Sequence, residues 1–464
     1  MSINSTLQKT GIPISVFSKL SFLLCLFHII NTHAQTWQYV GTPNFSINYA
    51  SSPTIAINSK GVPYVAYGED VGGGKASVRK FDGNSWVYVG LPGFSDSLAI
   101  GPIIAIDKQD TLYVAYRDYY DDEKATVKKF NGTDWVTVGS RGFSNITVDF
   151  SFTVSADGTP YFAYSDASSN AKLSVMNYTG NTWQYVGDEG FSSNYAEWNS
   201  IAIDNNGKPY VSFQDRGDSD KITVMKFDNG SWNIVGVQGF SGTSVFGTDI
   251  ALDSFGTPYV VYGNNNSPYK MSVMKFKDTA WVYVGVPEFS LNGVAFMALA
   301  LNKEGIPYVS FQDRANSSKA SVMKFNDTAW AYLGNAGFSS DEVMPTDIAI
   351  TPEGVPYVVY SDPGGTNNIS VQKYGIFTDV VFNESTNTDF NIYPNPANNK
   401  LSGNINYLQK SYLQILAIDG REIMSQELIQ RNNFEIDVSN LPAGLYFLVL
   451  HNDEARVVKK VVKE

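Results

Sequence analysis

Short runs in which apolar and polar residues alternate follow one another along most of the chain. The runs are rich in Val, Ile, Tyr and Phe and are separated by Gly, Pro, Asn and Asp. Alternation with a period of two is typical of β-strands that bury one face, and these separators are typical of turns. Pairs such as Asp82-Gly83, Asn131-Gly132 and Asn229-Gly230 favour the positive backbone angles of tight hairpins. The pattern predicts an all-β protein built from antiparallel meanders.

Three markers recur every 48 or 49 residues. The tryptophan of each copy stands at Trp37, Trp86, Trp135, Trp183, Trp232, Trp281 and Trp330. A Phe-Ser pair begins at Phe45, Phe94, Phe143, Phe191, Phe240, Phe289 and Phe338. A tyrosine that usually follows proline stands at Tyr64, Tyr113, Tyr161, Tyr210, Tyr259, Tyr308 and Tyr357. The chain therefore contains seven copies of one four-stranded unit.

Seven four-stranded units in succession predict a seven-bladed β-propeller over residues 35–374. The first Trp run, 37–41, has no copy before it, and the last copy ends at Tyr374 without such a run. We therefore expect residues 37–41 to complete the seventh blade and to close the ring, because an open seam would leave an unpaired strand edge. The recurring Trp and Phe residues are expected to pack in the core. Segments such as Phe81-Asp82-Gly83-x-x-Trp86 loosely resemble kelch repeats but lack their double glycine.

The first 34 residues differ from the repeats. Lys19 precedes the apolar run LSFLLCLFHII, and small residues stand near Ala34. This predicts a secretory signal peptide at 1–34, the alternative being an uncleaved membrane anchor. The run is shorter than the roughly 20 residues that span a bilayer.

Removal of this leader limits the available chemistry. It removes Cys25, the one cysteine, and leaves His451 as the one histidine. Thiol nucleophiles, Cys or His zinc sites and Ser-His triads are excluded from the repeats. Losing Lys9 and Lys19 changes the formal charge from −12 to −14, which disfavours nucleic acid as a partner. We expect no cofactor and no integral membrane segment in the mature chain.

The repeats stop near Gly375, and we expect a linker at 375–389 before a different domain at 390–464. There YPNPA at 393–397 is followed by LSG at 401–403, DGR at 419–421, LPAGLY at 441–446 and KKVVK at 459–463. In order and spacing these motifs closely resemble the type A C-terminal sorting domain of the Bacteroidetes type IX secretion system. The resemblance implies a small β-sandwich, the secretion machinery as a partner, and an extracellular or outer-surface location. A carbohydrate-binding β-sandwich is the alternative for this segment.

An acidic or amide residue ends the second strand of every copy, so we expect a ring of such residues on the face that carries the Phe-Ser loops. Its members are Glu69, Asp118, Asp166, Asp215, Asn264, Asp313 and Asp362. Ligands of propellers gather on such a face. The five aspartates are candidate ligand contacts. Alternatively, each accepts N–H bonds from its own loop.

Two further features are candidate contacts. Trp198 is the one tryptophan that does not recur, and we expect it in a loop between blades, with Phe150 and Phe296 at the matching places. It is a candidate plate for a sugar ring, or else it fills space between blades. The loop from Tyr119 to Glu123 is rich in oxygen atoms, but it lacks the spacing of a known calcium loop. Whether it holds a metal or is a solvated acidic loop stays open.

Two functions remain from different classes. A non-catalytic binding or adhesion propeller, with a glycan or a surface protein as ligand, fits the near-uniform repeats. A glycoside hydrolase that uses paired carboxylates, such as Asp118 and Asp166, is the alternative, because its chemistry needs no histidine. Uniform repetition favours binding, since a catalytic pair needs unlike environments.

Overall fold

The computed structural model describes residues 35–47, 49–70, 73–362, 367–376, 391–404, 411–417, 422–428, 433–451 and 456–464. The expected signal peptide and almost all of the expected linker lie outside these ranges. The chain divides into two compact units, the repeats and the C-terminal segment, and each is described by itself. In the described ranges no helix is both long and apolar enough to cross a membrane.

The described residues of the repeat unit form seven four-stranded antiparallel sheets. The first strands are β2 (Ala50–Ile57), β6 (Ala99–Ile106), β10 (Thr147–Val154), β14 (Ala196–Ile203), β18 (Val245–Leu252), β22 (Val294–Leu301) and β26 (Thr346–Ile350). The second strands are β3 (Pro63–Glu69), β7 (Leu112–Asp118), β11 (Pro160–Asp166), β15 (Pro209–Asp215), β19 (Pro258–Asn264), β23 (Pro307–Asp313) and β27 (Pro356–Asp362). Proline begins six of these second strands, where a missing N–H interrupts the ladder least.

The outer half of each sheet is a hairpin. The third strands are β4 (Lys75–Phe81), β8 (Lys124–Phe130), β12 (Lys172–Thr179), β16 (Lys221–Asp228), β20 (Met271–Lys277), β24 (Lys319–Phe325) and β28 (Asn368–Ile376). The fourth strands are β5 (Trp86–Tyr88), β9 (Trp135–Thr137), β13 (Thr182–Tyr185), β17 (Ser231–Ile234), β21 (Ala280–Tyr283), β25 (Trp330–Tyr332) and β1 (Gln35–Tyr39). Short 3₁₀ turns follow three second strands: η1 (Ala167–Ser169), η2 (Arg216–Asp218) and η3 (Arg314–Asn316).

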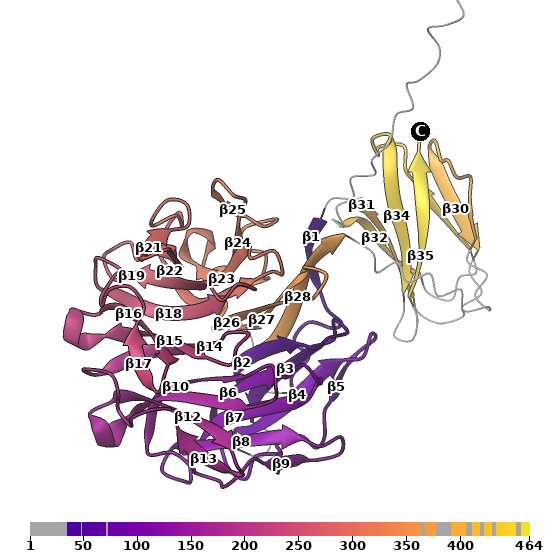
Figure 1. The fold of residues 1–464 in the computed structure, drawn as a ribbon. Helices are drawn as coiled ribbons and strands as arrows, with labels where there is room; N and C mark the ends of the chain where they lie inside the picture. Colours follow the sequence, from indigo (N-terminus) through magenta and orange to yellow (C-terminus); the bar gives the residue numbers. More distant parts are fainter. Residues whose placement is uncertain are drawn as a thin grey trace, which may run out of the picture. The chain divides into compact units, whose positions relative to one another are not determined.

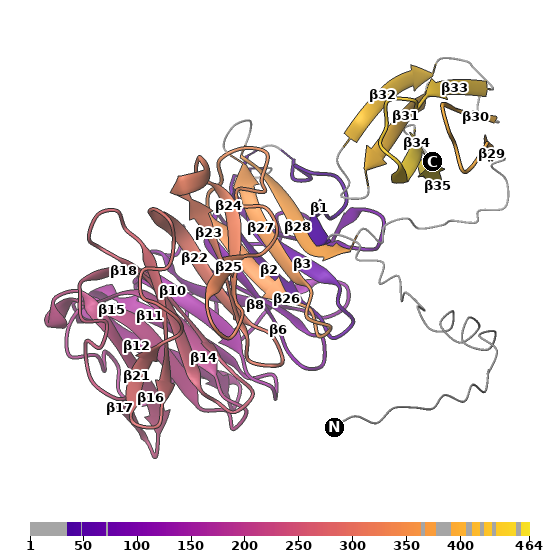
Figure 2. The same cartoon turned by 90° about the horizontal axis from the view of Figure 1, so that it is seen from above.

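Strand β1, at the start of the unit, pairs with β28 at its end (Figures 1 and 2). The pairing is antiparallel and sets Trp37 opposite Tyr374. The sheet order is β1-β28-β27-β26, so β1 takes the place that β5 or β9 takes in other sheets. First strands of successive sheets contact one another, and β2 also contacts β26.

The recurring aromatic residues hold neighbouring sheets together. The Phe of each Phe-Ser pair stacks on the Trp of the next copy, with ring centroids 3.8–4.4 Å apart, and Phe338 stacks on Trp37. Each indole N–H donates to a carbonyl of the preceding sheet at 2.6–2.8 Å, as Trp86 does to Val40. Such pairs combine a large buried area with a directional bond. These residues are therefore packing residues.

The second strands form the interior of each sheet, because neighbouring strands cover both their edges. Each fully buries a large aromatic ring at the same position, and β11 also buries Phe162; the shared set is Tyr67, Tyr116, Tyr164, Phe213, Tyr262, Phe311 and Tyr360. These strands alternate less clearly than the first strands, since both faces are buried.

The C-terminal unit has two sheets and one shared core. One sheet has the order β29-β30-β33, with strands Asn391–Tyr393, Lys400–Asn404 and Asn433–Asp437. The other has the order β32-β31-β34-β35, with strands Glu422–Leu428, Ser411–Ala417, Gly444–His451 and Arg456–Lys463. Leu401 and Phe434 of the first sheet share a buried cluster with Leu413 and Leu448 of the second. Within YPNPA, the Asn395 side chain donates to the Lys460 carbonyl and accepts from the Val462 N–H, which joins this motif to KKVVK.

Candidate functional site

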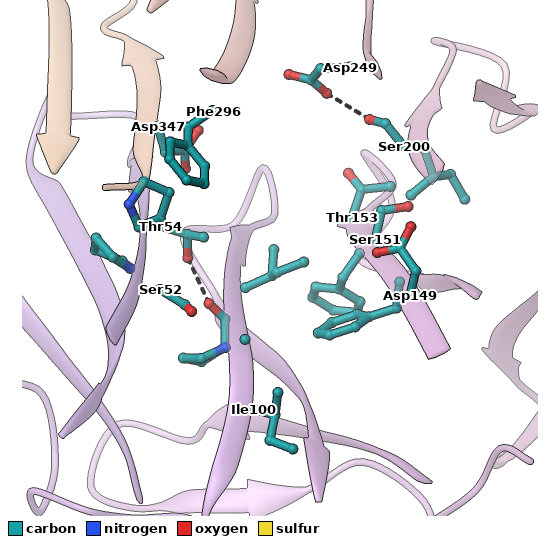
Figure 3. Close-up of a pocket in the computed structure, with 18 of the residues that line it drawn as sticks. Ser52, Thr54, Ile100, Asp149, Ser151, Thr153, Ser200, Asp249, Phe296 and Asp347 are labelled. Carbon is teal, nitrogen blue, oxygen red and sulfur yellow. Dashed lines mark hydrogen bonds between the residues drawn. The ribbon is translucent and has the colours of Figure 1, made fainter. Parts of the chain in front are cut away.

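A cavity of about 660 Å³ opens between the first strands of the repeat unit (Figure 3). All seven first-strand segments contribute to its wall, and Arg117 of β7 adds a guanidinium. The strands reach it through a local irregularity: the pairing register shifts near the start of six of the seven first strands. Such a bulge bends a strand and redirects its side chains. The position next to the cavity has a positive φ in five copies, at Ser52, Gly101, Trp198, Gly247 and Phe296.

Three carboxylates line this cavity: Asp149, Asp249 and Asp347. Each accepts a backbone N–H from the first strand of a neighbouring sheet, which is the next sheet along the chain for Asp149 and Asp249 and the first sheet for Asp347. Asp149 accepts from Asn199 at 2.9 Å, Asp249 accepts from Leu299 at 2.8 Å, and Asp347 accepts from Ile55 at 2.9 Å. In two other copies a hydroxyl does the same: Thr54 accepts from Ile104, and Ser200 accepts from Ile250. Polar side chains at the cavity therefore tie adjacent sheets together.

Burial within the wall makes these carboxyl groups weaker acids. It raises the pKa of Asp347 to about 7, with a further contribution from the negative charge of Asp249. It raises the pKa of Asp149 to about 6, although the bond from Asn199 and the charge of Arg117 act in the opposite direction. The pKa of Asp249 is raised as well, chiefly by burial. The cavity therefore contains carboxyl groups that titrate near neutral pH.

Trp198 lies in strand β14, so the expectation that it belongs to a loop between blades is wrong. It is 53% exposed and has a φ of 51°. In the third copy the residue that matches Trp198 is Asp149 and not Phe150. Trp198 lies 17 positions before Asp215, which ends the second strand, and Asp149 lies 17 positions before Asp166. The Phe-Ser loop of the third copy is one residue shorter, so counting from the Phe-Ser pair does not align the two copies. Phe296 does match Trp198, is 43% exposed and lines the cavity.

The acidic ring predicted from the sequence lies where the second strands end, beside the Phe-Ser loops. Asp118, Asp166, Asp215 and Asp313 are almost fully buried, and Asp362 is partly buried. Local partners occupy their oxygens. Asp118 forms a bidentate pair with Arg141 at 2.6 and 2.9 Å; Asp166, Asp215 and Asp313 accept N–H bonds from the 3₁₀ turns that follow them. Ser340 donates to Asp362 at 3.2 Å. Ligand contact by these five residues stays a prediction.

The oxygen-rich loop of the second copy is arranged around cations of the protein itself. Arg117 pairs with Glu123 at 3.0 Å, Lys124 lies 3.9 Å from Asp122, and Arg141 lies 3.9 Å from Asp121. Across the described residues, no group of three or more His, Cys, Asp or Glu side chains has the arrangement to hold a metal ion. The neighbouring Tyr119 and Tyr120 are exposed.

The sequence alone did not single out the three cavity carboxylates. Asp249 and Asp347 occupy the same position of their copies, 15 residues before the residue that ends the second strand, and Asp149 lies two positions earlier in its own copy. The available signal was a charged residue in a first strand, at a position where most copies have an apolar, small or neutral residue.

The comparisons with known proteins agree with this architecture. Residues 391–464 match the family model described as Secretion system C-terminal sorting domain. This is the sorting domain of the type IX secretion system, and it implies export to the cell surface or the extracellular space. The class is therefore an exported β-propeller with a C-terminal sorting domain. No curated protein matches the chain.

Solved structures share the fold of the repeats at low sequence identity. A polysaccharide lyase of family PL25, an ulvan lyase bound to -[GlcA(1-4)Rha3S]-, aligns with a TM-score of 0.50 and 12% identity, over 72% of this chain and 95% of that one. A second structure of that lyase aligns with a TM-score of 0.51 and 11% identity, over the same shares. A fucose-specific lectin from Aleuria aurantia aligns with a TM-score of 0.42 and 14% identity, over 63% of this chain and 99% of that one.

Proposed function

We propose that the repeat unit is a non-catalytic glycan-binding propeller, displayed at the cell surface or released after export. The observation that carries the proposal is the cavity between the first strands, with exposed aromatic residues at the bulges beside it. Phe296 lines this cavity, and Trp198 occupies the equivalent place in β14. Exposed aromatic faces beside hydroxyl and carboxyl groups suit a sugar, which has an apolar ring face and a polar edge.

The positive φ of Trp198 supports a role beyond packing. A bulky residue is uncommon in this backbone conformation, and glycine fits it without strain. Gly101 and Gly247 stand at this position in two other copies. A half-exposed tryptophan that takes the place of glycine adds apolar surface without filling the core, which favours contact with a ligand.

The cavity carboxylates favour binding over hydrolysis. Each is held by a backbone N–H of the neighbouring sheet, so its oxygens are already engaged in joining strands. One observation favours the alternative, a carboxylate-dependent glycoside hydrolase: a carboxyl with a pKa near neutral, such as Asp347 at about 7, can act as a general acid. In that case the pair would come from the cavity, because Asp118 and Asp166 are buried among their partners.

We also infer that the seven sheets form a closed seven-bladed ring. The pairing of β1 with β28, the stack of Phe338 on Trp37 and the contact of β2 with β26 support closure. A closed ring leaves no unpaired seam and fixes the first strands around the cavity.

The test is a screen of the purified full chain against a panel of neutral and acidic polysaccharides and oligosaccharides. Binding is read by isothermal titration, and cleavage is read by release of reducing ends and by ultraviolet absorbance of unsaturated products. We expect saturable binding without product release. Release of reducing ends without unsaturated products, abolished by Asp347→Asn, would establish the hydrolase instead, and no binding to any glycan would contradict the proposal.

A further inference from the structure

A second cavity of about 580 Å³ lies at the opposite end of the first strands, beside the turn between β26 and β27. Its wall combines tyrosines with basic side chains: Tyr308, Tyr357 and Tyr374 lie with Lys60, Lys324 and Lys373. Glu353 is the one acidic residue in the wall. The chain as a whole has a formal charge of −12, so this cluster of positively charged side chains is opposite in sign to the net charge.

The lysines of this wall belong to a repeated arrangement. A lysine of the third strand stands directly opposite the recurring tyrosine of the second strand in six copies, as Lys324 stands opposite Tyr308. The ammonium groups of Lys324, Lys226 and Lys275 lie over their tyrosine rings, with Nζ 5.2, 4.5 and 5.4 Å from the ring centroid. Such cation–π contacts hold the charged group in a fixed place on an aromatic surface.

The copies differ in what balances the lysine charge. In the sheet of β14–β17, Lys226 forms an ion pair with Asp204, the residue after the first strand, at 3.5 Å. Asp107 and Asp253 occupy the same place in two other copies. The copies whose turns or strands border the second cavity have neutral residues there: Asn58, Asn302 and Thr351. Among the described residues no carboxylate is paired with Lys324.

Lys324 lines the cavity together with Tyr374. Burial raises the pKa of the Tyr374 hydroxyl, and the Lys324 charge acts against that rise, which places the ammonium group close to a second tyrosine of the wall. The wall therefore contains tyrosines from three strands and a cation that is held against one of them.

We propose that this second cavity binds an acidic sugar, a residue that carries a carboxylate or a sulfate. Lys324 pairs with the anionic group, and the partly exposed ring of Tyr374 accepts the apolar face of the sugar ring. A cation that has no acidic partner is free to pair with an external anion, whereas Lys226 already has one. This site is separate from the cavity between the first strands and does not depend on binding there.

The experiment compares two anionic probes with a neutral one. The full chain is titrated with trigalacturonic acid, with a sulfated galactose trisaccharide and with maltotriose. We expect at least one anionic probe to bind and maltotriose to bind at least tenfold more weakly. Binding should weaken as salt is added, because screening acts on ion pairs. The two anionic probes distinguish carboxylate from sulfate recognition.

Matched variants locate the site. Lys324→Gln should weaken binding of the anionic probe at least fivefold, whereas Lys226→Gln, at the equivalent position of a sheet that supplies its own aspartate, should leave it unchanged. Glu353→Gln removes an exposed negative charge and should strengthen binding. Trp198→Gly should have no effect on this probe, which separates the two cavities.

Three results would overturn the inference. The first is an equal loss of affinity for the anionic probe in Lys324→Gln and Lys226→Gln. The second is an affinity that stays unchanged in Lys324→Gln and in Glu353→Gln alike. The third is that neither anionic probe binds.

Discussion

At the scale of single residues, recurrence in the sequence identifies the packing residues but not the residues that line the candidate site. The seven Trp and seven Phe residues recur because every pair of adjacent sheets is joined by the same Phe–Trp stack. Their packing role is predictable from this recurrence alone. Asp249 and Asp347 share one position of the repeat and Asp149 has another, and the proximity of all three arises only when distant strands meet around the cavity. Sequence cannot show this, because it depends on the placement of each strand around the axis.

The raised pKa of Asp347 makes a prediction about stability. Its carboxyl has the ordinary aspartate pKa of 3.8 when the chain is unfolded and a pKa of about 7 when it is folded. Between these values the folded chain holds a proton that the unfolded chain has released, so the free energy of unfolding falls as pH rises from about 4 to about 7. One such proton contributes at most about 1.4 kcal/mol per pH unit.

Asp347→Asn should therefore flatten the fall in unfolding free energy over this range. An asparagine oxygen can still accept the Ile55 N–H, so the link between strands is retained. Denaturant unfolding at a series of pH values measures the slope, with Asp188→Asn, at an exposed position, as the control. A slope equal to that of the unmodified chain would show that Asp347 does not titrate in this range.

At the scale of elements, strands and hairpins follow closely from the alternation of apolar residues and from the Asp-Gly and Asn-Gly turns. The bulges of the first strands do not, because the alternation continues through them while the pairing register shifts. Trp198, expected in a loop between blades, lies at such a bulge in β14. The acidic residues that end the second strands were placed at the right end of the strand, but their burial depends on loops that fold back over them.

The N-terminal strand gives a test of closure. Deleting residues 35–41 removes the pairing of β1 with β28 and the stack between Trp37 and Phe338. Loss of a buried tryptophan alone costs about 3–5 kcal/mol, so the melting temperature of the repeat unit should fall strongly. Removal of residues 391–464 should leave that melting nearly unchanged, because this segment forms its own core. Calorimetry of both truncations is the measurement, and equal effects would contradict a ring closed by β1.

At the scale of the whole molecule, the chain joins an exported propeller to its export signal. The C-terminal domain was recognisable from sequence because several of its motifs occur together in a fixed order, and the structure joins two of them, since Asn395 of YPNPA bonds to the backbone of β35. The ligand of the propeller was not, since repeats that share one fold differ in the few residues that face a ligand.

Export by the sorting domain is testable apart from the propeller. A secreted reporter joined ahead of residues 380–464 should leave a Bacteroidetes cell that has an intact type IX system. The same fusion should be retained when that system is disabled. Export that persists without the machinery would show that another route carries the chain.

The glycan-binding proposal is tested most directly by one titration on matched variants, with the best ligand from the polysaccharide panel. Trp198→Gly adopts the residue found at Gly101 and Gly247, so the backbone should be unstrained and the melting temperature nearly unchanged. Loss of the exposed indole ring should weaken binding by about 1–3 kcal/mol.

Asp215→Asn disturbs a buried acceptor of Gly217 and Gln238, so it should lower the melting temperature and leave affinity intact. Unchanged affinity in Trp198→Gly, or a specific loss of affinity in Asp215→Asn alone, would contradict binding at the face that carries Trp198.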